Sequence, residues 1–84
     1  MRSKHRNTIK AIFADPVRAN ISWAEIVVML SALGADISEG RGSRVRISLN
    51  DLDAVFHRPH PRKETDKGAV NTMRRFLKEA GVER

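Results

Sequence analysis

Residues 22–49 decide the fold, and they read SWAEIVVMLSALGADISEGRGSRVRISL. The first half of this stretch has helical periodicity, because its apolar residues recur every three or four positions. Ser22 and Glu25 form a capping box, in which each side chain is suited to bind the backbone N–H of the other residue. Gly34 is typical of the residue that follows a helix end. The sequence therefore predicts a helix over residues 23–33.

The hydrophobic period changes from 3.6 to 2 after this helix. Residues 35–39 are predicted as a first strand, and residues 40–42 as a turn. Residues 44–49 alternate between apolar and polar side chains, which is the pattern of a strand with one buried face. Asn50-Asp51 suits a tight turn into a third strand over residues 54–58. The polar face, with Arg44 and Arg46, is expected to remain open to solvent.

Two further helices flank these elements. Residues 3–13 form a short first helix that ends before Asp15-Pro16, and residues 67–80 form a last helix between Asp66 and Gly81. The prolines of residues 59–61 are expected to prevent further regular strand pairing. The order α-β-β-β-α predicts a two-layer α+β domain, with a three-stranded antiparallel sheet and both helices on one face.

This order of elements is that of double-stranded-RNA-binding domains. We divide the chain into an N-terminal basic arm with a short helix, residues 1–20, and the domain itself, residues 21–84. The sequence leaves open whether the arm packs on the core.

Composition narrows the class of protein further. Sixteen lysines and arginines stand against ten carboxylates, giving a net charge of +6, and an excess of this size attracts polyanions. The absence of cysteine excludes disulfides and thiolate metal sites. Neither a membrane span nor a signal peptide is evident, so we expect a cytoplasmic protein without contact with membranes. The basic residues gather in two clusters after the predicted helix. The candidate RNA-binding residues are Arg41, Arg44, Arg46, Arg58, Arg62, Lys63 and Lys67.

Several short motifs follow one another along the chain in a fairly specific order and spacing. They are Gly34-Ala35, Gly42-Ser43, FHRPHP at residues 56–61, GAV at residues 68–70, and LKEAGV at residues 77–82. Between residues 22 and 82 the chain thus resembles the HicA toxin family. The resemblance implies a fold like that of double-stranded-RNA-binding domains and a ribonuclease that cleaves messenger RNA and blocks translation. It also implies a HicB antitoxin as the partner that silences the toxin.

The chain departs from the family at one position. Family members typically carry a histidine, regarded as catalytic, one or two residues after the Gly-Ser pair, where this chain has Arg44 and Val45. Arginine remains protonated and valine has no exchangeable proton, so neither can be a general base. The best catalytic candidates are His57 and His60, because histidine can both accept and donate a proton near neutral pH.

Three outcomes remain open from the sequence. The first is that catalysis has moved to His57 or His60. The second is that the domain has lost cleavage and retains nucleic-acid binding, and the third is that the family histidine is less essential than supposed. Besides a ribonuclease and a nucleic-acid-binding module, a third and weaker class of function is a protein-interaction domain whose basic face binds an acidic partner. His5 is expected to be exposed. A metal site formed by two histidines is the less favoured interpretation, because no acidic ligand lies at a suitable spacing, and we expect no cofactor.

Overall fold

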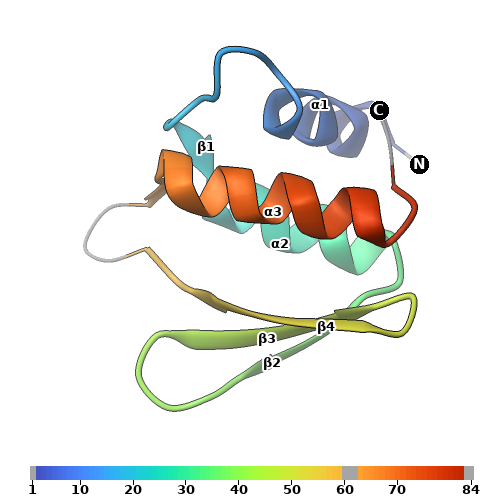
Figure 1. Cartoon of the computed structure of the whole chain (residues 1–84), viewed down its shortest axis with the longest axis vertical. Coiled ribbons are helices and arrows are strands. Elements are labelled where there is room, and N and C mark those ends of the chain that lie inside the picture. Colours follow the sequence, from blue (N-terminus) through green and yellow to red (C-terminus); the bar gives the residue numbers. More distant parts are fainter. Residues whose placement is uncertain (1, 60–62, 83–84) are drawn as a thin grey trace.

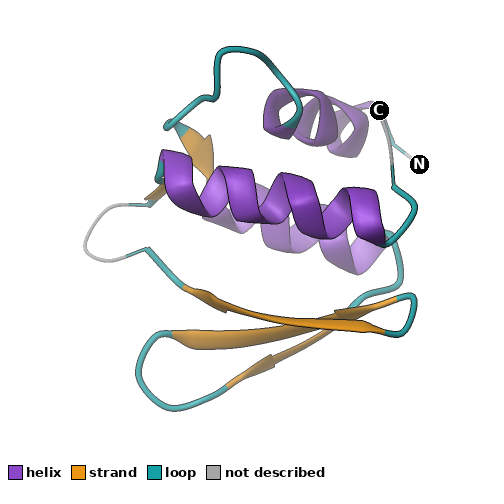
Figure 2. Cartoon of the chain, in the orientation of Figure 1, coloured by secondary structure: helices purple, strands orange, loops and turns teal. Residues whose placement is uncertain are grey.

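The computed structural model describes residues 2–59 and 63–82 of the chain. It confirms the predicted order of helices and strands, and adds two short strands (Figures 1 and 2). The elements are α1 (Ser3–Ile12), β1 (Ile21–Ser22), α2 (Trp23–Ala32), β2 (Asp36–Glu39), β3 (Arg44–Leu49), β4 (Leu52–His57), β5 (Glu64–Thr65) and α3 (Lys67–Glu79).

The helix ends lie close to where the sequence signals place them. Ser22 Oγ accepts the N–H of Glu25 at 3.4 Å, and an Asp66 carboxylate oxygen accepts the N–H of Ala69 at 2.8 Å. These side chains satisfy backbone donors that the first helical turn cannot. After α2, Gly34 takes a φ of +92°, a conformation that a residue with a side chain rarely adopts. The capping residues therefore set the bounds of both α2 and α3.

The main sheet is antiparallel, with the strand order β2-β3-β4. Asn50 and Asp51 join β3 to β4 with φ values of 50° and 68°. Two consecutive left-handed residues make the tight turn that fits the twist of a β-hairpin. Strand β4 begins at Leu52 rather than Ala54, because this turn lets pairing start immediately beside it. The turn thereby fixes the register that places Val45 opposite Phe56.

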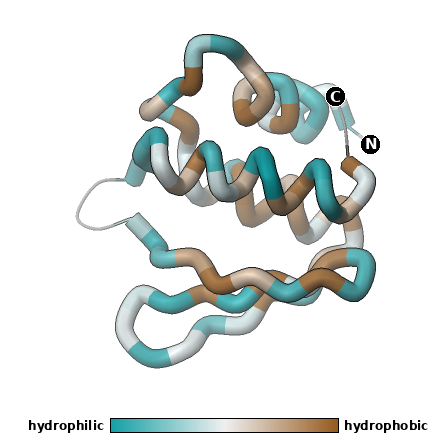
Figure 3. Tube along the Cα trace, viewed as in Figure 1, coloured by the Kyte–Doolittle hydropathy of each residue, from teal (hydrophilic) through white to brown (hydrophobic). Residues whose placement is uncertain are grey.

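One face of this sheet forms the core with α2 and α3. Val45, Ile47 and Leu49 of β3 are buried, as their alternation predicts. Figure 3 shows the same alternation as successive hydrophobic and hydrophilic segments along the strands. Both helices cover the same face in Figure 1, which confirms the two-layer α+β architecture and leaves the outer face of the sheet uncovered.

Helix α1 packs against α2, α3 and β1, on the side of the helices that faces away from the sheet (Figure 1). Ile9 and Ile12 join the common hydrophobic core, so the helix of the N-terminal arm is folded onto the domain. The expectation of an exposed His5 is wrong. Its side chain lies on the buried face of α1 with Ile9 and Ile12, one turn before Ile9, and the residue is only 8% exposed.

A second, two-stranded sheet was not expected from the sequence. Ile21 of β1 pairs with Thr65 of β5, and Ser22 pairs with Glu64. The prolines end β4, but Glu64 lies far enough beyond them to pair with a different segment. His60 and Pro61 lie outside the described residues. In the described part of the chain, no helix has the length and apolar content needed to cross a membrane.

Candidate nucleic-acid interface

The outer face of the sheet carries the side chains that the core does not use. Arg44 and Arg46 of β3 and His57 of β4 are all exposed on this face, as their strand positions predict. Val45 instead points into the core, where it is 2% exposed. Of the two residues that follow the Gly42-Ser43 pair, only Arg44 can therefore meet a ligand on this face.

Arg44 and His57 are direct neighbours across β3 and β4. The N–H of Arg58 donates to the carbonyl of Ser43 at 2.7 Å, and backbone bonds of this kind alternate along antiparallel strands. The Arg44–His57 pair thus occupies a position without backbone hydrogen bonds, where side chains of neighbouring strands approach most closely. A guanidinium and an imidazole are thereby held side by side in solvent.

Arg58 follows His57 but is engaged differently. Its guanidinium donates to a Glu39 carboxylate oxygen at 2.6 Å, with the two side chains 44% and 64% exposed. Such an exposed ion pair contributes little to stability and can be exchanged for another anion. Arg58 is therefore a weaker candidate for nucleic-acid binding than Arg44 in the unbound protein.

The remaining basic candidates lie near the start of α3. Lys63 and Lys67 are exposed, and the Lys63 carbonyl accepts the N–H of Trp23 at 3.0 Å, which anchors this segment beside α2. Figure 1 shows the β2–β3 turn, the end of β4 and the start of α3 at the same end of the molecule. The exposed Arg41 of the turn shares this end. The candidates Arg62 and His60 lie outside the described residues.

The opposite end of the outer face is acidic. The Ser48 hydroxyl donates to the Asp53 carboxylate, and Asp36 lies beside Ser48 on the neighbouring strand. The described residues contain no group of three histidine, cysteine or acidic side chains that could hold a metal ion. The outer face is therefore positively charged at one end of the strands and negatively charged at the other. Counting charges along the sequence does not reveal this separation.

A hollow extends from the basic end of this face toward its middle. It is lined by Ser38, Glu39, Gly40, Arg44, Arg46 and Val55. Val55 is 53% exposed, an unusual position for a large apolar side chain at the middle of a polar face. The alternation on β4 could have identified Val55 as an outward residue, but the sequence reasoning did not single it out.

Comparison with known proteins identifies the family. No curated protein and no solved structure matches the chain. The family model described as the HicA toxin of bacterial toxin–antitoxin systems matches residues 23–82, from the first residue of α2 to the residues that close α3. The match covers more than half of the chain and includes the whole three-stranded sheet. The chain therefore belongs to the HicA toxin family of bacterial toxin–antitoxin systems.

Proposed function

We propose that this toxin is a metal-independent endoribonuclease that cleaves messenger RNA in the cytoplasm and is neutralised by a HicB-type antitoxin. Membership of a toxin–antitoxin family implies an antitoxin partner in general. The observation that carries the proposal of cleavage is the Arg44–His57 pair. In this pair the exposed imidazole of His57 on β4 lies on the same face as Arg44 on β3, directly beside the position that follows the Gly-Ser pair.

The chemistry of RNA cleavage matches these two side chains. His57 would remove the proton from a 2′-hydroxyl, whose oxygen then attacks the adjacent phosphorus. Arg44 would stabilise the negative charge that develops on the phosphoryl oxygens. The bond to the 5′-oxygen then breaks, and a proton donor is needed there. His60 is the candidate donor for that step.

A second function is favoured by one feature of the site. Arginine at the position after Ser43 is a phosphate-binding residue and not a base, so the domain could bind RNA without cleaving it. The two functions differ in a single measurable property, since only the first breaks phosphodiester bonds.

The outer face of the sheet is also the proposed binding surface for the antitoxin. Val55 offers an apolar contact at the centre, and Arg46, Asp36 and Asp53 surround it with charges of both signs. Protein interfaces combine an apolar centre with a polar rim. A HicB-type protein bound here would cover Arg44 and His57 and so prevent access of RNA.

The decisive experiment compares two variants on this face with the wild type. Purified protein is incubated with a single-stranded RNA in the presence of EDTA, and the products are separated by electrophoresis. We expect cleavage by the wild type, and a loss of about 100-fold or more in His57→Gln, which removes the proton acceptor. Asp36→Asn, an exposed change on the same face, is expected to cleave normally.

The outcomes separate the two functions. RNA binding by the wild type without any cleavage would establish the binding module and exclude the ribonuclease. Equal cleavage by wild type and His57→Gln would remove His57 from the mechanism. Expression in growing cells, with and without a HicB-type antitoxin, tests toxicity independently of the purified RNA substrate.

A further inference from the structure

The net charge of the chain is not carried by its sheet. Residues 36–58, which span β2 to β4, their turns and the residue after β4, contain four arginines and four carboxylates. Helix α1 carries three lysines and arginines and no acid, and α3 carries four against a single glutamate. The remaining segments balance to zero, so the whole excess of +6 resides in α1 and α3. The strongest positive potential is thus expected over the helices.

These two helices present their charges side by side. Arg74 of α3 donates to the carbonyls of Ile12 and Ala14 at 2.9 and 2.7 Å, which fixes the end of α1 beside the middle of α3. Figure 1 shows the two helices running in opposite directions. Lys78 lies one helical turn after Arg74, on the same side of α3. It therefore lies on the part of α3 next to the N-terminal half of α1.

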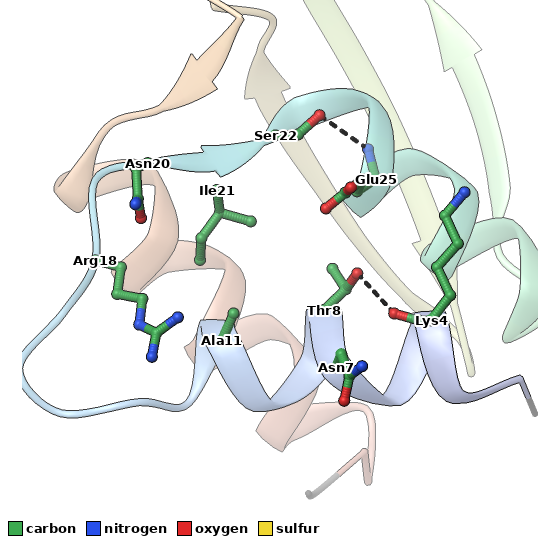
Figure 4. A pocket seen from close by; sticks show the side chains of 9 residues that line it. All are labelled: Lys4, Asn7, Thr8, Ala11, Arg18, Asn20, Ile21, Ser22 and Glu25. Carbon is green, nitrogen blue, oxygen red and sulfur yellow. Dashed lines mark hydrogen bonds between the residues drawn. The ribbon is translucent and has the colours of Figure 1, made fainter.

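The residues that line a hollow beside α1 show which side of this helix faces away from α3. Lys4, Asn7 and Ala11 line a hollow that also includes Arg18 and residues of β1 and α2 (Figure 4). At 100° per residue, Arg6 lies on the flank of α1 away from this hollow, and Lys10 lies next to Arg6 on the solvent-facing side of the helix. The flank that bears Arg6 is the one next to α3.

The result is a surface of four exposed cations, which we name the α1–α3 surface. It consists of Arg6, Lys10, Lys78 and Arg75, the last of which lies next to Lys78 on the solvent-facing side of α3. Within residues 2–59 and 63–82, none of the four forms an ion pair. They are therefore available to an external anion.

The chemistry of the surface indicates which kind of polyanion it fits. In the described part of the chain, the large exposed apolar side chains are Val28 and Val55, and both lie on other elements. Exposed Asn71 of α3 adds a hydrogen-bond donor to the cations. A protein partner requires an apolar centre to bury, whereas a phosphodiester backbone requires only cations and donors. The composition favours a nucleic acid.

We propose that the α1–α3 surface is a second RNA-binding surface that grips the sugar–phosphate backbone of duplex RNA, away from the sheet and its Arg44–His57 pair. Helix α1 lies before the segment matched by the family model, so this half of the surface is additional to the family domain. The inference rests on the proposed action on RNA, and extends it from the site of cleavage to the site of binding.

Two matched double variants test the inference. One is Lys10→Gln with Arg75→Gln on the α1–α3 surface; the other is Lys4→Gln with Arg18→Gln beside the hollow on the opposite flank of α1. Each removes two positive charges. The dissociation constant for an RNA duplex of about 20 base pairs is measured between about 50 and 200 mM salt, and circular dichroism checks that each variant is folded.

We expect the first variant to bind about tenfold more weakly and to lower the slope of log Kd against log salt by about 2. The second variant is expected to retain the wild-type slope. Equal effects of the two variants would show that net charge alone matters, and would overturn the inference.

Two other outcomes would also overturn it. A wild type that neither binds nor cleaves RNA refutes the proposed function itself, which distinguishes that failure from failure of the surface alone. A first variant that loses binding to poly-glutamate but retains binding to RNA assigns the surface to an acidic protein instead.

Discussion

Arg74 is predicted to hold the N-terminal helix on the domain, and its substitution tests the packing directly. Its guanidinium donates through Nε to Ile12 O at 2.9 Å, through Nη2 to Ala14 O at 2.7 Å, and through Nη1 to Asp15 Oδ1 at 3.4 Å. The carbonyls at the end of a helix lack partners within the helix. A fixed cation there both satisfies them and opposes the negative end of the helix dipole.

The magnitude follows from these contacts. Each hydrogen bond from a charged group contributes about 1.5 to 3 kcal/mol, and the two carbonyls set free would regain part of this by binding water. The ion pair with Asp15 adds little, because the Asp15 side chain is 86% exposed. We therefore expect Arg74→Ala to lower the free energy of unfolding by about 2.5 kcal/mol. In a domain of this size, that corresponds to a fall in Tm of roughly 10 to 20 °C.

The assay is urea unfolding followed by circular dichroism, with Arg75→Ala as the matched control. Arg75 is the exposed neighbour of Arg74 and is expected to change stability by no more than about 0.5 kcal/mol. The free energy of unfolding of Arg74→Lys is expected to lie between those of the two alanine variants, because an ammonium retains the charge but not the planar guanidinium with its several donors. Equal stability of the two alanine variants would refute the idea that Arg74 anchors α1.

Two further predictions concern the turns, and both use urea unfolding. Gly34→Ala is expected to lower the free energy of unfolding by about 1 to 2 kcal/mol, because φ is +92° at this position. Gly68→Ala, in the first turn of α3, is expected to raise the free energy of unfolding by about 0.5 kcal/mol, because alanine has a higher helix propensity than glycine. The reverse order would contradict the backbone argument. Asn50→Ala is expected to lose about 2 kcal/mol, through its φ of 50° and the bond from Nδ2 to Ala80 O at 2.6 Å. Asn50→Gly also loses this bond but has no backbone strain, so it should lose about half as much. Equal losses in the two variants would show that the backbone strain contributes nothing.

The features predicted correctly from the sequence are those whose cause is local. Ser22 and Asp66 cap helices through bonds to residues three positions away, and Asn50-Asp51 forms its turn through its own backbone preferences. Strand β3 was predicted with its observed bounds because its period of 2 is uninterrupted. These signals need no knowledge of the rest of the chain.

The features that were missed arise from contacts between distant segments. Arg74 meets Ile12 across 62 positions of the chain, and nothing near either residue indicates it. The pairing of Ile21 with Thr65 and the burial of His5 likewise depend on how α1 and the chain around it fold back on the core. The candidate site was predicted in part, since alternation gave Arg44 and Arg46 an exposed face. The pairing of Arg44 with His57 required the register of the hairpin.

The separation of the two surfaces leads to a kinetic expectation. The α1–α3 surface lies on the helices, whereas Arg44 and His57 lie on the outer face of the sheet, which the helices do not cover. Contacts far from the reacting phosphate bind substrate and transition state alike, so removing them raises KM and leaves kcat unchanged. The Lys10→Gln, Arg75→Gln variant should therefore raise KM alone, while His57→Gln should lower kcat. A fall in kcat for the helix variant would mean that the RNA held by the helices is positioned for cleavage there, and that one continuous surface, rather than two, carries out the reaction.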